Sequence, residues 1–145
     1  MASNRMIDRN GHRFGAALSG VGLLVAYLAD WRPVAPTMSA VFAIGVVFGL
    51  RYSPMGATYR TLKKTLRLSV PVVPEDEAPP RFAQAMGLLF SLLGTVGFYA
   101  FSWGTASWAF VLIVAALQAL LGVTGICVGC EMYLVGKRLG ARGAA

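Results

Sequence analysis

Long apolar stretches separated by short polar ones dominate the pattern along the chain. No charged residue occurs from 82 to 130, and between 14 and 50 the only charges are Asp30 and Arg32, beside Pro33. A helix that crosses a bilayer needs about 20 apolar residues, so each stretch accommodates two helices joined by a turn. The pattern therefore predicts an all-α, integral membrane four-helix protein. The predicted spans are about 14–29, 34–50, 82–101 and 106–126.

Composition supports this prediction. The chain is 57% hydrophobic and only 13% charged, whereas soluble domains are about 25% charged; a very apolar soluble bundle is therefore disfavoured. The first apolar stretch follows several arginines, as in a signal peptide. A second span follows it closely, however, and no convincing cleavage site precedes a polar mature chain, so we expect it to be retained. We expect one membrane domain over residues 1–145.

The basic residues predict the orientation in the membrane, because cytoplasmic loops are enriched in Lys and Arg. Of the 13 basic residues, only Arg32 lies in a predicted outer turn. The others precede the first span, separate the second from the third, or follow the fourth: Arg5, Arg9, Arg13; Arg51, Arg60, Lys63, Lys64, Arg67, Arg81; Lys137, Arg138, Arg142. We therefore expect a multi-pass plasma (inner) membrane protein with both termini in the cytoplasm. Anionic lipid head groups are the expected partners of the positive side, and no nucleic acid is expected.

The segment between the second and third spans has two parts. In residues 55–69, Tyr59, Leu62 and Leu66 recur at helical spacing among basic residues, which predicts an amphipathic helix on the cytoplasmic membrane surface. Its lipid-facing basic surface would consist of Arg60, Lys63, Lys64 and Arg67, although these residues also fit a solvated face or a partner surface. Residues 70–80 are rich in proline and acidic residues and predict an extended linker.

A faint internal repeat relates the two apolar stretches. The first predicted span begins with Arg13-Phe14-x-x-Ala17, and the third begins with Arg81-Phe82-x-x-Ala85. Both stretches start on the same predicted side of the membrane. The pattern is consistent with two duplicated helical hairpins related by an axis along the membrane normal, although apolar helices also match one another by chance.

The only two cysteines lie in 124-TGICVGCEMY-133, at the end of the last apolar stretch. From Gly104 to Cys127 a helix would extend roughly 34 Å at 1.5 Å per residue, against a hydrocarbon core about 30 Å thick. The pair should therefore lie at the cytoplasmic edge, where a permanent disulfide is not expected. If a helix starts near Thr124, its free N–H groups stabilise a thiolate at Cys127.

These observations suggest thiol chemistry with three roles. Cys127 would be the attacking thiol and Cys130 the resolving one. Glu131 would be a proton donor if it is protonated or swung aside, because its charge would otherwise raise the pKa of the Cys127 thiol. Two alternatives remain open. A zinc ion could bind Cys127, Cys130, Glu131 and His12, or the four thiolates of a dimer; alternatively, the cysteines are only small buried residues. No cofactor is predicted.

Three stretches, 49-GLRYSPMGATYR-60, 79-PPRFAQAMG-87 and 125-GICVGCEMYL-134, resemble the bacterial integral membrane family catalogued as domain of unknown function 4395. The resemblance covers nearly the whole chain. It implies a small four-helix membrane protein, often linked with thioredoxin-like or sulfurtransferase proteins, and it implies no established activity. Members usually carry Phe where this chain has Ile126. Some carry further cysteines in a C-terminal tail, which here reads 140-GARGAA-145, so no mechanism with a second pair is expected.

Two classes of function follow. In the first, a membrane thiol protein exchanges disulfide, persulfide or electrons with a cytoplasmic partner, through Cys127 and Cys130. In the second, the chain is a non-catalytic accessory or assembly subunit of a larger membrane complex. Whether the protein is an enzyme is left open. No nucleotide-binding loop or Ser/His/Asp set occurs, and a single histidine provides no haem pair.

Overall fold

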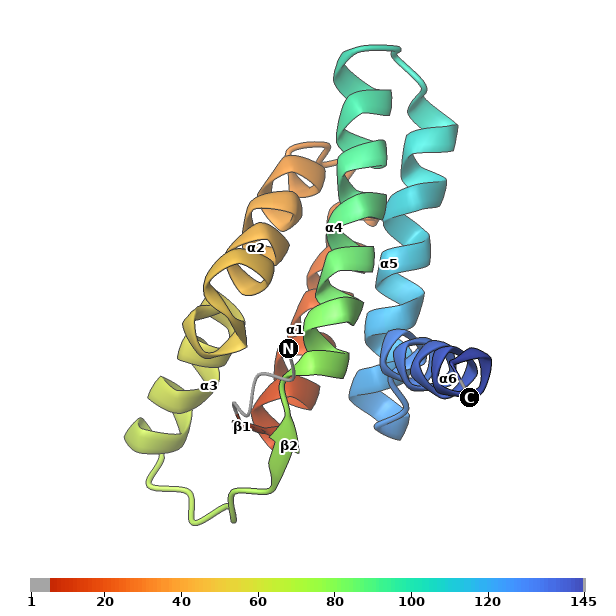
Figure 1. Ribbon diagram of the computed structural model, residues 1–145. Coiled ribbons are helices and arrows are strands. Elements are labelled where there is room, and N and C mark those ends of the chain that lie inside the picture. The colour runs from red at the N-terminus through yellow and green to blue at the C-terminus, as the bar shows by residue number, and fades with distance from the viewer. Residues whose placement is uncertain (1–5, 145) are drawn as a thin grey trace.

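Residues 6–144 are described by the computed structural model, and within this range the chain forms six α-helices, a short 3₁₀ helix and two short strands (Figure 1). Arg5 lies outside the described residues. The elements are β1 (Met6–Asp8), α1 (Arg9–Leu28), α2 (Val34–Phe48), η1 (Leu50–Tyr52), α3 (Pro54–Thr65), β2 (Pro74–Asp76), α4 (Ala78–Tyr99), α5 (Gly104–Thr124) and α6 (Val128–Gly143). The predicted all-α class is confirmed.

Four long helices form the body of the molecule. α1 packs mainly against α5 and α2 mainly against α4, while α4 and α5 also contact each other. The turns between α1 and α2 and between α4 and α5 lie at one end, and α3, the strands and α6 lie at the opposite end (Figure 1). Among the described residues, α4 and α5 are long and apolar enough to cross a membrane, and α2 is apolar but shorter.

Part of the region predicted as an extended linker, residues 70–80, forms regular secondary structure. Strand β2 pairs antiparallel with β1, with Ile7 opposite Glu75. Helix α4 already begins at Ala78, because prolines at positions 79 and 80 fit a first helical turn, where backbone N–H groups have no partner within the helix. Glu77 is buried, and its Oε1 accepts a hydrogen bond from the Leu50 backbone N–H at 2.7 Å. The acidic residue therefore joins α4 to the end of α2.

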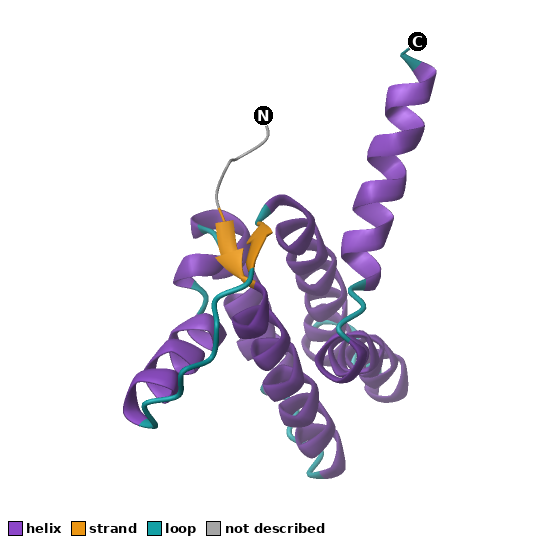
Figure 2. Cartoon of the chain, turned by 90° about the horizontal axis from the view of Figure 1, so that it is seen from below, coloured by secondary structure: helices purple, strands orange, loops and turns teal. Residues whose placement is uncertain are grey.

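The two short helices also differ from the sequence prediction. α3 ends at Thr65 rather than near residue 69, and Arg67 has a left-handed backbone with φ 50°. α6 was not predicted as a separate element; the sequence indicated only a helix start near Thr124. In the structure α5 ends at Thr124, and a new helix starts at Val128. Figure 2 shows α6 extending away from the bundle.

The two halves of the chain, α1–α3 and α4–α6, make corresponding polar contacts. Arg13 of α1 donates to two carbonyls in the last turn of α5, at 3.4 and 3.3 Å. Arg81 of α4 donates to two carbonyls in the last turn of α2, at 2.7 and 3.2 Å. Helix C-termini carry free carbonyls and a partial negative charge, so a guanidinium is a favourable partner there. Each half therefore supplies an arginine to the other.

Aromatic contacts repeat in the same way. The ring of Phe14 in α1 lies 5.5 Å from that of Tyr59 in α3, and the ring of Phe82 in α4 lies 5.8 Å from that of Tyr133 in α6. Both pairs are tilted by 44°. The first helix of each half thus holds the third helix of the same half through a Phe–Tyr pair.

Small residues bring α1 and α5 close together and so position the end of α5. A Cβ atom on Gly122 would lie 2.8 Å from the Ala17 Cα, and one on Gly20 would lie 3.1 Å from the Ala119 nitrogen. Contacts this short leave no room for a side chain. The beginning of α1 is consequently fixed beside the loop that carries the cysteines.

Candidate functional site

Cys127 and Cys130 form a disulfide at the start of α6. Cys127 is the N-cap of this helix, with an extended backbone, and its Sγ accepts a hydrogen bond from the Cys130 N–H at 3.3 Å. The first N–H groups of a helix have no partner within it and stabilise negative charge nearby. The helix start that the sequence placed conditionally near Thr124 is at Val128, so Cys127 is the N-cap of α6 and does not lie in its first turn.

Local backbone geometry explains why the pair lies at this position. Gly125 ends α5 with a φ of 77°, a left-handed conformation that glycine adopts without steric cost. The Arg13 side chain lies beside it: a Cβ on Gly125 would come within 3.2 Å of the guanidinium. The same guanidinium donates to the carbonyls of Gly122 and Val123. α1 therefore holds the loop between α5 and α6 from one side.

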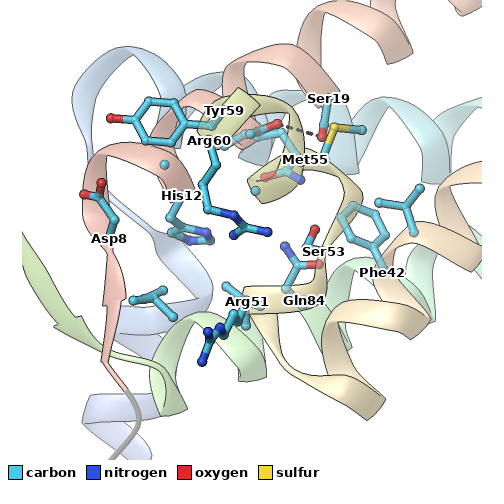
Figure 3. Close-up of a pocket in the computed structure, with 18 of the residues that line it drawn as sticks. Asp8, His12, Ser19, Phe42, Arg51, Ser53, Met55, Tyr59, Arg60 and Gln84 are labelled. Atoms are coloured by element: carbon cyan, nitrogen blue, oxygen red, sulfur yellow. Dashed lines mark hydrogen bonds between the residues drawn. The ribbon is translucent and has the colours of Figure 1, made fainter. Parts of the chain in front are cut away.

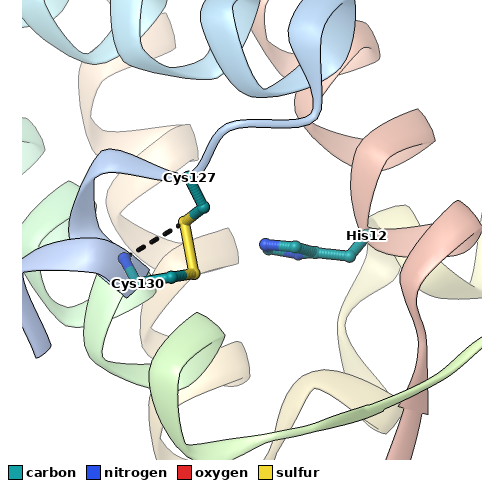
Figure 4. A group of neighbouring side chains, drawn as sticks. All are labelled: His12, Cys127 and Cys130. Atoms are coloured by element: carbon teal, nitrogen blue, oxygen red, sulfur yellow. Dashed lines mark hydrogen bonds between the residues drawn. A yellow bond between two sulfur atoms is a disulfide. The ribbon is translucent and has the colours of Figure 1, made fainter. Parts of the chain in front are cut away.

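His12 is the third chemical group at this site, and it comes from α1. A ring nitrogen of His12 and the two Sγ atoms lie within 4.8 Å of one another. Figure 4 shows the imidazole directed at the disulfide. The His12 Nε2 is buried and has no hydrogen-bond partner among the described residues. Burial lowers the pKa of His12 from 6.5 to about 4, so the ring is neutral near pH 7.

A cavity of about 280 Å³ adjoins the disulfide, lined mostly by apolar side chains of α4, α5 and α6. Cys127 lines this cavity together with His12. Two amides, those of Gln84 and Gln118, are its other polar side chains. Cys127 thus faces an apolar cavity that contains a few hydrogen-bonding groups.

The sequence-predicted residues are only partly brought together. Cys127 is partly buried and Cys130 is buried with 7% exposure, so Cys127 is the more accessible thiol. Glu131 is exposed on the first turn of α6 and does not line the cavity. His12 takes the position beside the sulfurs. The zinc alternative drawn from the sequence grouped His12 with both cysteines and Glu131. The packing of α1 on α5 brings His12 to the two cysteines, whereas Glu131 stands outside the group.

A second cavity, of about 380 Å³, lies between α1, α2 and α3 (Figure 3). Arg51, Arg60 and Lys63 line it, and His12 lines both cavities. Burial, with a smaller contribution from Asp8, raises the pKa of Tyr59 in its wall. Of the four residues predicted to face lipid, Arg60 and Lys63 line this cavity; Arg60, Lys64 and Arg67 are exposed, and Lys63 is partly buried.

Together these features define a class: an all-α protein with a Cys-x-x-Cys pair at a helix N-terminus, beside a buried histidine. The chain belongs to the family described as Domain of unknown function (DUF4395), whose profile matches residues 7–138. The resemblance inferred from the sequence motifs is thereby confirmed. No curated protein and no solved structure matches the chain.

Proposed function

We propose that this chain is a bacterial plasma membrane protein that exchanges disulfide or sulfur with a cytoplasmic partner through Cys127 and Cys130. The observation that carries the proposal is the position of the pair at the N-terminus of α6, with the His12 imidazole beside it. A thioredoxin-like or sulfurtransferase protein is the partner class that we propose.

The outer surface supports placement in a membrane, with α1, α2, α4 and α5 as four spans. Large apolar side chains on these helices are exposed, among them Val21, Val25, Leu92, Val96 and Val123. Beside a core of large apolar side chains such as Phe42 and Trp108, the interior also contains hydroxyl-bearing residues such as Ser19, Ser39 and Ser91. Small residues at helix contacts with apolar residues outside are typical of helices packed in lipid. A soluble protein rarely exposes so much apolar surface.

The proposed orientation places α3, α6 and the cysteines at the cytoplasmic side. The described basic residues other than Arg32 lie in or next to the elements at this end of the bundle. Lys64 on α3, Arg67 just after it, and Lys137 and Arg138 on α6 are exposed and available to anionic lipid head groups.

Three features support Cys127 as the attacking thiol. It is more exposed than Cys130, its sulfur accepts the Cys130 N–H, and it stands at the positive end of α6. In the reduced protein, the Cys127 thiolate would attack a partner disulfide, forming a mixed disulfide and releasing one partner thiolate. Cys130 would then lose its proton and attack the Cys127 sulfur, which releases the second partner thiolate and leaves the Cys127–Cys130 disulfide.

We assign the removal of the Cys130 proton to His12. Its ring is neutral, and one of its nitrogens lies within 4.8 Å of both sulfurs. A neutral imidazole can accept the Cys130 proton as the sulfur attacks, but a pKa of about 4 makes His12 a weak base, so the proton moves only together with the attack. We propose that Glu131, on the exposed side of α6, donates a proton to the thiolate that leaves the partner.

Duplication of a helical unit explains the corresponding contacts of the two halves. Both halves consist of two long helices followed by a short one. In each half, an arginine of the first helix binds a helix end of the other half, and a Phe–Tyr pair joins the first helix to the third. We infer that the unit is α1–α3 repeated as α4–α6, and thus longer than the helical hairpin suggested by the sequence.

An accessory role in a larger membrane complex is the second candidate. One observation favours it: α6 buries only Cys130, and it exposes Met132, Val135 and Leu139 at helical spacing. This apolar stripe fits either the membrane surface or another subunit. Copurification of an enzyme complex in constant ratio, together with full function of a variant lacking both cysteines, would favour this candidate over exchange chemistry.

Thiol accessibility tests the main proposal. In inverted membrane vesicles, an impermeant maleimide should alkylate Cys127 without denaturation. A mild oxidant should form the Cys127–Cys130 disulfide, and a dithiol should reverse it. If both thiols react only after denaturation and the double serine variant behaves as wild type, the cysteines are packing residues.

A further inference from the structure

Three metal-ligating side chains converge at the start of α6. Cys127 and Cys130 come from one turn of chain, and His12 comes from α1, more than a hundred residues earlier in the sequence (Figure 4). We propose that the reduced cysteine pair and His12 form a binding site for one thiophilic metal ion per chain, with Zn²⁺ as the favoured ion. The site does not require the exchange reaction proposed above.

The spacing of the three ligand atoms fits such an ion. Zinc binds thiolate sulfur at about 2.3 Å and imidazole nitrogen at about 2.0–2.1 Å, so ligand atoms around a tetrahedral ion lie roughly 3.5–3.8 Å apart. Here the two Sγ atoms and the ring nitrogen lie within 4.8 Å of one another. Reduction would let the sulfurs separate, and a shift of about 1 Å in the histidine side chain would complete the geometry.

The unpartnered imidazole nitrogen is an independent observation that indicates a ligand. The His12 Nε2 is buried without a hydrogen-bond partner among the described residues. More than about nine in ten buried polar groups have a partner, and an exception often marks the site of an ion or water. The ring is directed at the two sulfurs (Figure 4), so an ion bound there would satisfy it.

The ligand types select the class of ion. The described group contains two thiolates and one imidazole and no carboxylate, because Glu131 is exposed and stands outside it. Magnesium and calcium prefer oxygen ligands, whereas soft sulfur selects zinc or Cu⁺. With Zn²⁺ the two thiolates are neutralised, whereas Cu⁺ leaves one negative charge. Since charge burial is unfavourable, the buried Cys130 and the apolar cavity favour Zn²⁺.

Three protein ligands would leave one coordination position for another group. Cys127 and His12 both line the apolar cavity, so an ion between them would border it. A water or an incoming thiol could occupy this fourth position. Metal binding and the disulfide would exclude each other, because the ion requires both sulfurs as thiolates.

Cobalt binding to the full chain tests the proposal. The chain would be purified in detergent, reduced under anaerobic conditions and titrated with Co²⁺, a coloured substitute for Zn²⁺. We expect thiolate-to-cobalt charge-transfer absorption that saturates at one ion per chain and disappears when Zn²⁺ is added. The oxidised chain should show none. Absence of this absorption from the reduced chain would overturn the proposal.

Substitutions then test the ligand set. Cys127→Ser should abolish the absorption, and His12→Ala should weaken Co²⁺ binding at least about 10-fold, since loss of even an outer-shell group costs that much. His12→Gln is a second variant of similar polarity. Arg9→Ala, an exposed position on the same helix, is the matched control and should bind as wild type. Unchanged helical circular dichroism and reversible disulfide formation in the His12 variants would show that they fold.

Three results would contradict the assignment. Unchanged Co²⁺ affinity in both folded His12 variants would remove His12 from the site. Saturation at half an ion per chain would indicate four thiolates shared by two chains. Competition for Cu⁺ against a chromogenic chelator identifies the ion, and Cu⁺ binding without Co²⁺ or Zn²⁺ binding would overturn the choice of zinc. A chain that exchanges disulfides but binds no metal would refute this inference alone.

Discussion

The two halves of the molecule share an architecture and differ in chemistry. α1–α3 and α4–α6 each consist of two long helices and a short one that starts after a non-helical N-cap residue. In the first half that residue is Ser53, and its cavity includes the basic side chains of Arg51, Arg60 and Lys63 among apolar ones. In the second half it is Cys127, and its cavity is apolar. Repeated packing builds the fold, and a few side chains at equivalent positions decide what each half can do.

His12 shows that the halves are not independent. It belongs to α1, yet its ring lies beside the cysteines of the second half. The exchange of arginines between the halves produces this arrangement, because Arg13 holds the start of α1 against the end of α5. A site with residues from both halves therefore needs the two halves to be correctly packed against each other.

Membrane orientation gives the largest expected effect. If the halves are parallel repeats, each should start and end on the cytoplasmic side. Reporter fusions after Ala145 and between residues 66 and 70 should both indicate the cytoplasm, and a fusion within residues 102–105 should indicate the outside. Opposite locations for the first two fusions would show that the halves are inverted rather than parallel.

A residue exchange between the halves tests their equivalence in packing. In the first half Met55 packs on Gly15, whereas in the second half Gly129 packs on Ala83, with a Cβ on Gly129 only 2.6 Å from that of Ala83. Gly129→Met should therefore destabilise the protein by about 1–3 kcal/mol through overpacking. Adding Ala83→Gly, which recreates the first-half pair, should restore most of the loss.

Thermal unfolding in detergent, followed by circular dichroism, measures this exchange. Gly136→Met is the matched control on α6, because a Cβ there meets no atom within 4 Å. If Gly129→Met is as stable as the control, or if Ala83→Gly fails to compensate, the two contacts are not equivalent.

The two arginines should have similar effects on stability but different effects on the thiols. Arg13→Ala and Arg81→Ala each remove two hydrogen bonds to helix-end carbonyls, and each should cost about 1 kcal/mol or more. Only Arg13 holds the loop that carries Cys127. Alkylation rates of the reduced chain should therefore rise in Arg13→Ala and stay unchanged in Arg81→Ala. Equal alkylation rates in the two variants would show that Arg13 does not control access to Cys127.

Lipid binding by the third helices gives the smallest expected effect. A peptide of residues 55–69 should become helical with anionic vesicles and respond little to neutral ones. Lys64→Gln should weaken its binding by about 1 kcal/mol, less at high salt. A peptide of residues 128–143 should behave in the same way. Equal response to anionic and neutral vesicles would remove the electrostatic part of the proposal.

Local patterns in the sequence predicted much of the fold. The boundaries of the long helices follow from where apolar runs meet charges and prolines, and the shared Arg-Phe pattern at residues 13 and 81 marked the contacts that repeat. A helix start near Thr124 was considered from the glycines, but the length of α6 could not be predicted, because the apolar run of α5 continues into it. In the structure α6 starts at Val128, after the positive φ of Gly125. Strands β1 and β2 are too short to show the alternation of apolar and polar residues that predicts a strand. They form because two segments far apart in the sequence pair with each other.

The candidate site could be predicted only in part. The cysteine spacing and the helix start are local features, so they were visible in the sequence. His12 and the burial of Glu77 depend on which helices pack together, and no local pattern encodes that choice. Glu131 was predicted as a proton donor because it closely follows both cysteines in the sequence. The structure shows the same residue on an exposed face of α6.

Trapping of a mixed disulfide tests the central claim most directly. Cys130→Ser and Cys127→Ser chains would be expressed in native membranes, and complexes stable without reductant would be separated and identified by mass spectrometry. We expect Cys130→Ser to accumulate a dithiol-reversible complex with a cytoplasmic thiol protein through Cys127. Cys127→Ser should not do so, because its remaining thiol is buried. Trapping by Cys127→Ser alone, or by neither variant, would contradict the assignment of Cys127 as the attacking thiol.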